Sequence, residues 1–172
     1  MENSKSVQHS CPNPTGQISK NEKGCQPILE MMTKNVITVS IDGTLKEALQ
    51  IFRTHKIRHV IVVDAKNVPK GVFSKRDLLM LQSSQNAGPL MEKKVISSAT
   101  MNPIMMDMYT CIRVVAQSMI DNKIGCVPIV SNSTAGTLVG IVTESDFVKA
   151  YASQVQCYCT QIPSNVSDGK GA

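Results

Sequence analysis

An internal repeat constrains the fold of this chain of 172 residues more than any other feature of its sequence. Two short segments recur 69 residues later, and a third segment between them recurs with an offset of 67. The matching pairs are Met32-Thr33 with Met101-Asn102, Lys56-Ile57 with Lys123-Ile124, and Gly71–Asp77 with Gly140–Asp146. Structural repeats tolerate insertions in turns and loops. We therefore expect the offset to slip by two residues in the turn before a helix and to recover in a later loop.

Each copy predicts the order strand, helix, strand, strand, helix. Short β-branched or continuous apolar runs indicate the strands, and Thr44 followed by Glu47 has the pattern of a capping box that starts a helix. The first copy is expected to hold strands Val36–Val39, Val60–Val63 and Val68–Phe73, a helix from Leu45, and a helix capped by Ser74 that extends through Leu81. The second copy is expected to hold strands Ile104–Met108, Cys126–Val130 and Leu138–Val142, a helix Ile112–Asp121, and a helix from Thr143 to about Ala152. One unit of about 55 residues buries too little apolar surface to fold alone, so two units should pack together.

The sequence on either side of the repeats is polar. We expect a flexible N-terminal tail (1–26), a first repeat (27–85), a linker (86–99), a second repeat (100–156) and a flexible C-terminal tail (157–172). No apolar run reaches the roughly 20 residues of a membrane span, and the N-terminus lacks the apolar core of a secretory signal. A cytoplasmic protein without membrane contact is therefore expected.

Residues for catalytic and metal chemistry are few. The chain has three His, and it lacks the motifs of zinc proteases, P-loop proteins and dinucleotide-binding proteins. Of its six cysteines, Cys111 and Cys126 lie in apolar segments and are expected to be small core residues, while the pair Cys157 and Cys159 is a weak metal signal. The sequence therefore predicts no enzyme and no metal site. A net charge of +5 is too small to indicate a nucleic-acid partner.

Related motifs open and close the repeats. The closing motif reads Gly71-x-x-Ser74-x-x-Asp77 in the first copy and Gly140-x-x-Thr143-x-x-Asp146 in the second. Together with Met32-Thr33-x-x-Val36 and the middle strand Ile57–Asp64, these residues resemble a tandem pair of CBS domains, the module named after cystathionine β-synthase. The resemblance covers about 125 residues and implies an α/β fold. In that fold, two β-α-β-β-α repeats pack around a pseudo-two-fold axis, and such pairs commonly associate into flat dimers.

The resemblance also implies that the closing motifs hold an adenosine-containing ligand. A helix N-terminus attracts phosphate, and a carboxylate accepts hydrogen bonds from the two ribose hydroxyls. Ser74 with Asp77, and Thr143 with Asp146, would supply these groups. The alternative interpretation is a plain helix cap with an Asp in the first turn.

Two ligand sites are implied, one for each repeat. The first comprises Thr33, Val36, Ile37, Arg58, His59, Val60, Ser74 and Asp77. The second comprises Asn102, Met105, Met106, Gly125, Cys126, Val127, Thr143 and Asp146. Arg58 and His59 equip the first site for a phosphate tail, whereas Gly125 and Cys126 leave the second without charge, so that it is empty or takes a less anionic ligand. Asn102 stands where the family usually has Thr. For the apolar residues of both sites the alternative is ordinary core, and for Arg58 and His59 it is a solvated strand end.

The sequence thus predicts a regulatory module without catalytic activity. It would bind AMP, ADP, ATP or S-adenosylmethionine between the repeats and transmit its state to an effector protein, with a homodimer as the expected assembly. The alternative is a constitutive dimerisation or protein-interaction module whose clefts have lost their ligand.

Overall fold

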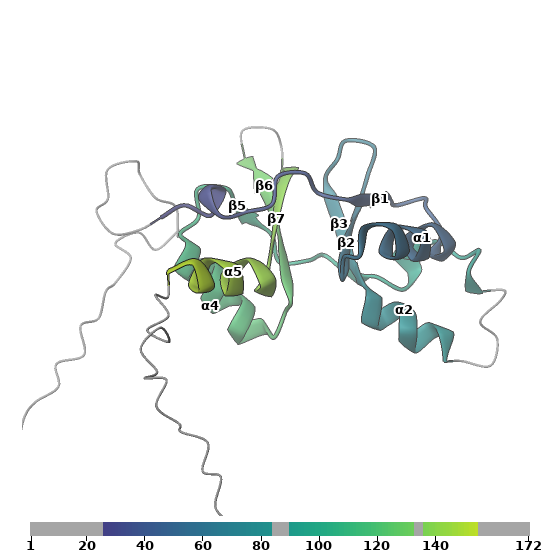
Figure 1. Ribbon diagram of the computed structural model, residues 1–172. Coiled ribbons are helices and arrows are strands. Elements are labelled where there is room, and N and C mark those ends of the chain that lie inside the picture. Colours follow the sequence, from purple (N-terminus) through teal and green to yellow (C-terminus); the bar gives the residue numbers. More distant parts are fainter. Residues whose placement is uncertain (1–25, 84–89, 133–135, 155–172) are drawn as a thin grey trace, which may run out of the picture.

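The computed structural model describes residues 26–83, 90–132 and 136–154, which form two α/β units side by side (Figure 1). The predicted tails, apart from Gln26, and the cysteines other than Cys111 and Cys126 lie outside the described residues. The first unit contains β1 (Thr38–Ser40), α1 (Leu45–His55), β2 (His59–Val63), β3 (Pro69–Ser74), α2 (Lys75–Gln82), the 3₁₀ turn η2 (Val95–Ser97) and β4 (Thr100–Met101). The second contains the 3₁₀ turn η1 (Ile28–Glu30), β5 (Met106–Asp107), α4 (Ile112–Asn122), β6 (Cys126–Ser131), β7 (Thr137–Thr143) and α5 (Glu144–Gln154). The predicted order of elements is confirmed in both copies.

Three strands of each sheet have the same topology. In each unit a parallel pair, β1–β2 or β5–β6, is joined by a helix, and an antiparallel partner follows as β3 or β7. The helices α1 and α4 end at equivalent lysines, Lys56 and Lys123, whose φ angles of 54° and 53° lie in the left-handed region. This shared turn carries the chain from the helix into the central strand.

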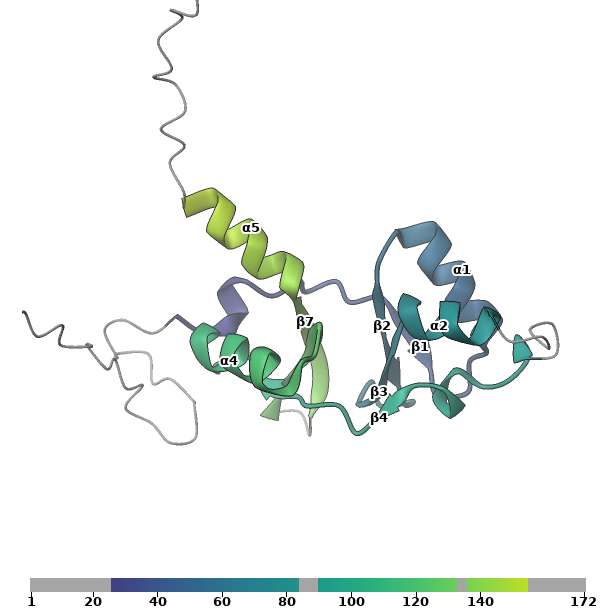
Figure 2. The ribbon, with the colours of Figure 1, turned by 90° about the horizontal axis from the view of Figure 1, so that it is seen from below.

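The sequence copies exchange their opening segments in space. The segment before β1 crosses to the second unit, where Thr33 and Ile141 of β7 exchange two backbone hydrogen bonds of 2.9 and 3.0 Å. In the same way, β4 adds to the first unit by pairing with β3 through Gly71 and Val72. Both crossings are visible, the purple segment in Figure 1 and the teal chain after β4 in Figure 2.

This exchange shortens the first strand of each copy. Val36–Val39 was expected as a strand, but only Thr38–Ser40 is paired, and Ile104–Met108 reduces to Met106–Asp107. The residues before these strands leave their own sheet to reach the other unit. The offset also slips here, before the first strand, because Val39 and Met106 are already equivalent at an offset of 67. The expectation that it slips in the turn before the helix is therefore wrong, while its recovery in the loop between the two antiparallel strands is confirmed.

The core divides accordingly into three clusters. Leu45, Phe52 and Phe73 fill the first unit together with Val95, which comes from the segment predicted to be a linker and is fully buried. The second unit is filled by side chains that include Ile28 and Met32 from the opening segment, with Val115, Val127 and Ile129. The third cluster lies between the units and comprises Ile61, Val63, Cys126, Leu138 and Ile141, with Val36 and Val72 against it. The facing sheets are thus joined by an apolar layer, with the helices on the outer sides (Figure 2).

The two described cysteines differ in state. Cys126 is a free thiol buried between the units, as a core residue should be. Cys111 is also buried, but it is disulfide-bonded, and its partner lies outside the described residues. The expectation that Cys111 is a small core residue is confirmed, and the disulfide adds a covalent constraint that was not predicted. Its apolar sequence context predicts burial but carries no information on its bonding.

Candidate functional site

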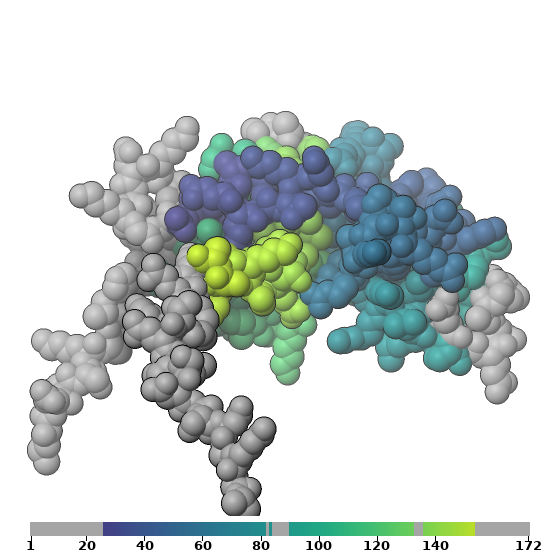
Figure 3. Space-filling view, in the orientation of Figure 1, coloured from purple at the N-terminus to yellow at the C-terminus, as the bar shows by residue number. Residues whose placement is uncertain are grey.

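A cavity of about 320 Å³ lies where the two units meet. Three parts of the chain line it: the crossing segment before β1, the junction of α1 and β2, and the junction of β7 and α5. These parts meet on the face shown in Figure 3, where the purple crossing segment runs above the yellow-green α5 and reaches the blue first unit. The lining residues are Thr33, Asn35, Val36, Ile37, Lys56, Ile57, Arg58, His59, Ile141, Thr143, Ser145, Asp146 and Lys149.

The start of α5 places a carboxylate in this cavity. Asp146 Oδ2 accepts hydrogen bonds from the backbone N–H of Thr143 and from its hydroxyl, both 2.8 Å long. These bonds fix the carboxylate beside the first turn of α5, where unpaired backbone N–H groups and the positive end of the helix dipole favour an anion. Asp146 Oδ1 is not used in these two bonds, so the arrangement offers a fixed acceptor next to a site that attracts negative charge.

Three cations line the same cavity as this carboxylate. Lys56, Arg58 and Lys149 line the cavity from the end of α1, the start of β2 and α5. The guanidinium of Arg58 crosses between the units, because its Nη2 donates a 3.0 Å hydrogen bond to Ser145 Oγ. With one carboxylate and three cations among its lining residues, the cavity is suited to a ligand with a negatively charged group.

His59 lies at the base of the same contact between units. A Cβ built on Gly125 would be 3.1 Å from both Cε1 and Nε2 of the imidazole, so the ring packs on the second unit where a residue has no side chain. Burial, followed by the charge of Arg58, lowers the pKa of His59 below 6.5, and Glu144 and Asp77 oppose this shift. The imidazole therefore remains neutral to a lower pH than an exposed histidine.

The cavity combines residues that the sequence assigns to separate sites. Thr33, Val36, Ile37, Arg58 and His59 of the predicted first site are brought together with Thr143 and Asp146 of the predicted second site. The crossing of the opening segment produces this combination, because Thr33 is hydrogen-bonded to β7 and not to its own sheet. In this cavity the opening segment of the first copy therefore lies beside the closing motif of the second copy, a combination that the assignment by repeat does not include.

The other predicted site residues lie elsewhere. Ser74 and Asp77 form a complete capping box at the start of α2, with the Ser74 hydroxyl 2.6 Å from Asp77 Oδ2, and they do not line this cavity. Val60 and Val127 are fully buried and belong to the cores of the first and second units, so they contribute packing. The remaining predicted residues, also outside the lining, are Asn102 with a φ of 49°, the exposed Met105, the half-buried Met106 and Gly125, and the buried Cys126.

Some lining residues escaped prediction. Lys56 belongs to a matched pair of the repeat, and Ser145 lies inside the closing motif, so a signal existed for both. Asn35 and Lys149 have no repeat partner of the same type, and only the fold brings them to the site. Among the described residues, no group of three or more His, Cys, Asp or Glu could hold a metal ion.

A second cavity of about 470 Å³ lies on the helical side of the second unit. Ala116, Met119, Ile120 and Lys123 of the α4 region line it together with Glu144 and Phe147 of α5. Large apolar side chains around it are exposed, including Ile120 at 68% and Val148 at 66%.

Within the described part of the chain, no helix combines the length and apolar character needed to cross a membrane.

Comparison with known proteins identifies the family. The sequence profile of the CBS domain matches residues 28–84 and 101–153. The chain therefore belongs to the CBS domain family and carries two copies of the domain.

Three relatives illustrate the similarity. A CBS domain-containing protein of Dictyostelium discoideum is 29% identical over 129 residues, which are 70% of this chain and 88% of the relative. The crystal structure of a protein described as a putative acetoin utilization protein from Vibrio cholerae is 30% identical with a TM-score of 0.66, covering 75% of this chain and 92% of that one. A CBS domain pair crystallised with 5′-methylthioadenosine and S-adenosyl-L-methionine is 25% identical with a TM-score of 0.63, covering 73% and 99%.

Proposed function

We propose that this protein is a non-catalytic regulatory module that binds an adenosine-containing ligand in the cavity between its two CBS repeats. One observation carries the proposal: a single cavity joins the Thr143–Asp146 helix start to three cations and to the apolar side chains of the crossing segment. The relative that was crystallised with 5′-methylthioadenosine and S-adenosyl-L-methionine supports the adenosyl class.

Each part of the ligand has a suitable group in the cavity. Asp146 is placed to accept hydrogen bonds from ribose hydroxyls, as ionised carboxylates do. Lys56, Arg58 and Lys149 attract phosphate, and Arg58 can contact it through two parallel N–H groups. Val36 and Ile37 provide an apolar surface for the flat base.

The charge of the cavity favours a nucleotide over S-adenosylmethionine. S-Adenosylmethionine carries a positive sulfonium, which three neighbouring cations disfavour, whereas AMP, ADP and ATP carry negative phosphates. We therefore rank the phosphorylated ligands first for this cavity. The prediction of a second site at Ser74 and Asp77 stays a prediction, and the binding stoichiometry tests it.

Ligand binding would act on the relation between the two units. A ligand in this cavity touches β2 of one unit and α5 of the other. It therefore stabilises the arrangement in which these two elements lie together, and it increases the population of that arrangement. An effector protein or a second copy of the chain would sense this change. We propose the helical face as the contact surface for a homodimer. Its exposed apolar side chains are Leu79, Met80, Ile120, Val148 and Tyr151.

These exposed side chains also favour a second candidate function, a constitutive interaction module without ligand. Both closing motifs act as helix caps, and this role alone accounts for their Asp residues. In that case association through the helical face would persist whether or not an adenosyl compound is present.

The test is calorimetry and thermal unfolding with AMP, ADP, ATP and S-adenosylmethionine, on the wild type and on two matched variants. Asp146→Ala and Asp77→Ala each remove a capping carboxylate, but only Asp146 lines the cavity. We expect Asp146→Ala to weaken AMP binding about tenfold or more, since a hydrogen bond to a charged group is worth roughly 1.5–3 kcal/mol. Asp77→Ala should leave the affinity of this cavity unchanged. The absence of binding by all four compounds, or equal losses in both variants, would contradict the proposal.

A further inference from the structure

His59 is the one histidine among the described residues that faces both the cavity and the contact between units. It starts β2, where its register partner is Ser74 of β3, the residue that caps α2. On the other side its ring packs on Gly125, next to the Glu144 side chain at the start of α5. A change of charge on this imidazole is therefore felt by the starts of two helices and by the cavity.

Charges of both signs act on the imidazole ring of His59. Within the first unit, Arg58 and Arg76 disfavour the protonated ring and Asp77 favours it; from the second unit, Glu144 favours it. The other charged groups that line the cavity with His59 are Lys56, Lys149 and Asp146. Burial is the largest cause of the lowered pKa of His59, and the charge of Arg58 is the next largest.

A bound phosphate would change this balance. Arg58 lowers the pKa of His59 more than any other charged group does, and it lines the same cavity. Its guanidinium would form an ion pair with the phosphate, which weakens its effect on the imidazole. The phosphate would also add negative charge within reach of the imidazole, which favours its charged form.

We propose that His59 takes up a proton when a phosphate-bearing ligand enters the cavity, so that binding strengthens as the pH falls through the neutral range. This inference rests on the proposed function and adds a regulation to it. The sign follows from linkage: if the pKa of His59 is higher in the complex than in the free protein, affinity rises as the pH falls between these two values. Above both values the effect vanishes, because the ring is neutral in both states.

The size of the effect follows from the exposure of the site. A fully buried charge partner shifts a pKa by 1–3 units, and the half-buried His59 should respond less. We expect its pKa to rise by about half a unit to one unit on binding, which makes the affinity roughly three- to tenfold higher at low pH.

The test is an NMR titration of the histidine rings in the full chain, with and without saturating AMP, from about pH 5 to 8. The chain has three histidines, so the signal lost in His59→Gln assigns this ring. We expect its pKa to lie below 6.5 in the free protein and to rise with AMP, and adenosine, which has no phosphate, should not raise it. The NMR signal of the ring reports the protonation of His59 alone. It therefore distinguishes this protonation from that of the phosphate, which has a pKa of about 6.

His55 provides the matched control. It lies in the exposed last turn of α1 and does not line the cavity, so AMP should leave its ring signals unchanged. In calorimetry, His59→Gln should lose the three- to tenfold gain at low pH that His55→Gln retains. AMP binding with an unshifted His59 overturns this inference alone, whereas the absence of binding by any adenosyl compound at every pH overturns the proposed function with it.

Discussion

Cys126 and His59 occupy equivalent positions at the starts of β6 and β2, opposite Thr143 and Ser74. One is a thiol sealed between the units, and the other is an imidazole at the edge of a cavity. The residues before them differ as well, because Arg58 precedes His59 and Gly125 precedes Cys126. The two copies are therefore least alike at the start of the central strand. The sequence predicts this asymmetry, because both pairs can be read from the alignment of the two copies.

The thiol of Cys126 should react very slowly with alkylating reagents in the folded protein. Burial, with a smaller contribution from Glu144, raises its pKa to about 12. Since the thiolate is the nucleophile, we expect alkylation by iodoacetamide at pH 8 to be roughly a thousandfold slower in the native than in the unfolded protein. Peptide mapping by mass spectrometry measures this rate. Equal labelling of Cys126 in buffer and in denaturant would show that the interface opens readily.

The individual residues of the site were more predictable than their grouping. The repeat matches Thr143 and Asp146 with Ser74 and Asp77, and the resemblance to CBS domains adds Arg58 and His59. It does not reveal which closing motif each opening segment meets. That choice depends on backbone pairing between Thr33 and β7, for which a β-strand segment has no side-chain signature.

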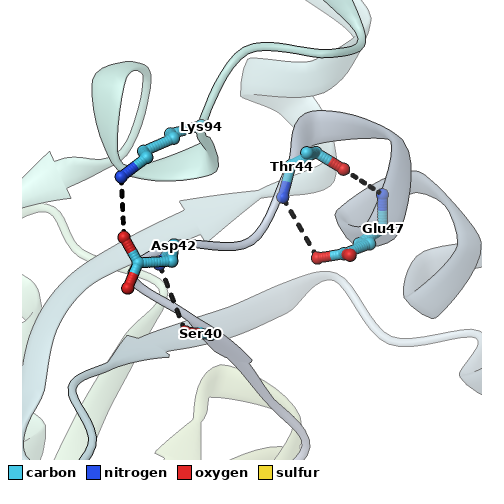
Figure 4. A network of polar contacts seen from close by, with 5 residues as sticks. All are labelled: Ser40, Asp42, Thr44, Glu47 and Lys94. Carbon is cyan, nitrogen blue, oxygen red and sulfur yellow. Dashed lines mark hydrogen bonds and ion pairs between the residues drawn. The ribbon is translucent and has the colours of Figure 1, made fainter.

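At the scale of elements, the start of α1 shows why local signals are reliable here. Thr44 Oγ1 accepts a 3.2 Å hydrogen bond from the backbone N–H of Glu47, and Glu47 Oε2 accepts one of 3.1 Å from Thr44 (Figure 4). Nearby, Lys94 Nζ is 2.6 Å from Asp42 Oδ1, beside the backbone bond from Val95 N–H to the carbonyl of Gly43. The predicted capping box is confirmed, because it depends only on residues three apart.

Removing this cap should destabilise the first unit. Thr44→Ala deletes the hydroxyl that satisfies a helix N–H, at a cost of about 1 kcal/mol in the free energy of unfolding. Thr54→Ala, on the exposed surface of the same helix, is the matched control and should be neutral or slightly stabilising, since Ala has the higher helix propensity. Chemical denaturation measures both. A Thr44 variant as stable as the Thr54 variant would mean that solvent replaces the lost bond.

The short strands β1 and β5 were the least predictable elements. Their β-branched and apolar residues predict longer strands. Several of these residues instead lie in the segment that has left the sheet, where they pack against other parts of the molecule. Val36 packs in the cluster between the units and also lines the cavity. Tertiary contacts thus override the local preference.

At the scale of the whole molecule, the exchange of segments means that the unit in which a core residue packs does not follow from its position in the sequence. Ile28 is fully buried in the second unit, although it precedes the first. Leu45 is equally buried in the first unit. The overall fold was predictable from the repeat, and the exchange was not, because an apolar residue such as Ile28 can fill either core.

The two residues give a matched pair of variants. Ile28→Ala should lower stability by about 2–5 kcal/mol and increase hydrogen exchange first in β6, β7 and α4, whereas Leu45→Ala should do so first in β2, β3 and α1. Exchange measured by mass spectrometry separates these patterns. Faster exchange of β2 and β3 in the Ile28 variant would show that the opening segment supports the first unit instead.

The crossing of the opening segment has a consequence for the order in which the protein is made. Ile28 and Thr33 leave the ribosome among the first described residues, but their partners on α4, β6 and β7 are among the last. The first unit can complete its core only once Val95 has emerged, and the second only once Val142 of β7 has emerged. Until β7 has emerged, Ile28 and Met32 lack their full set of core partners, so the nascent chain exposes these apolar side chains.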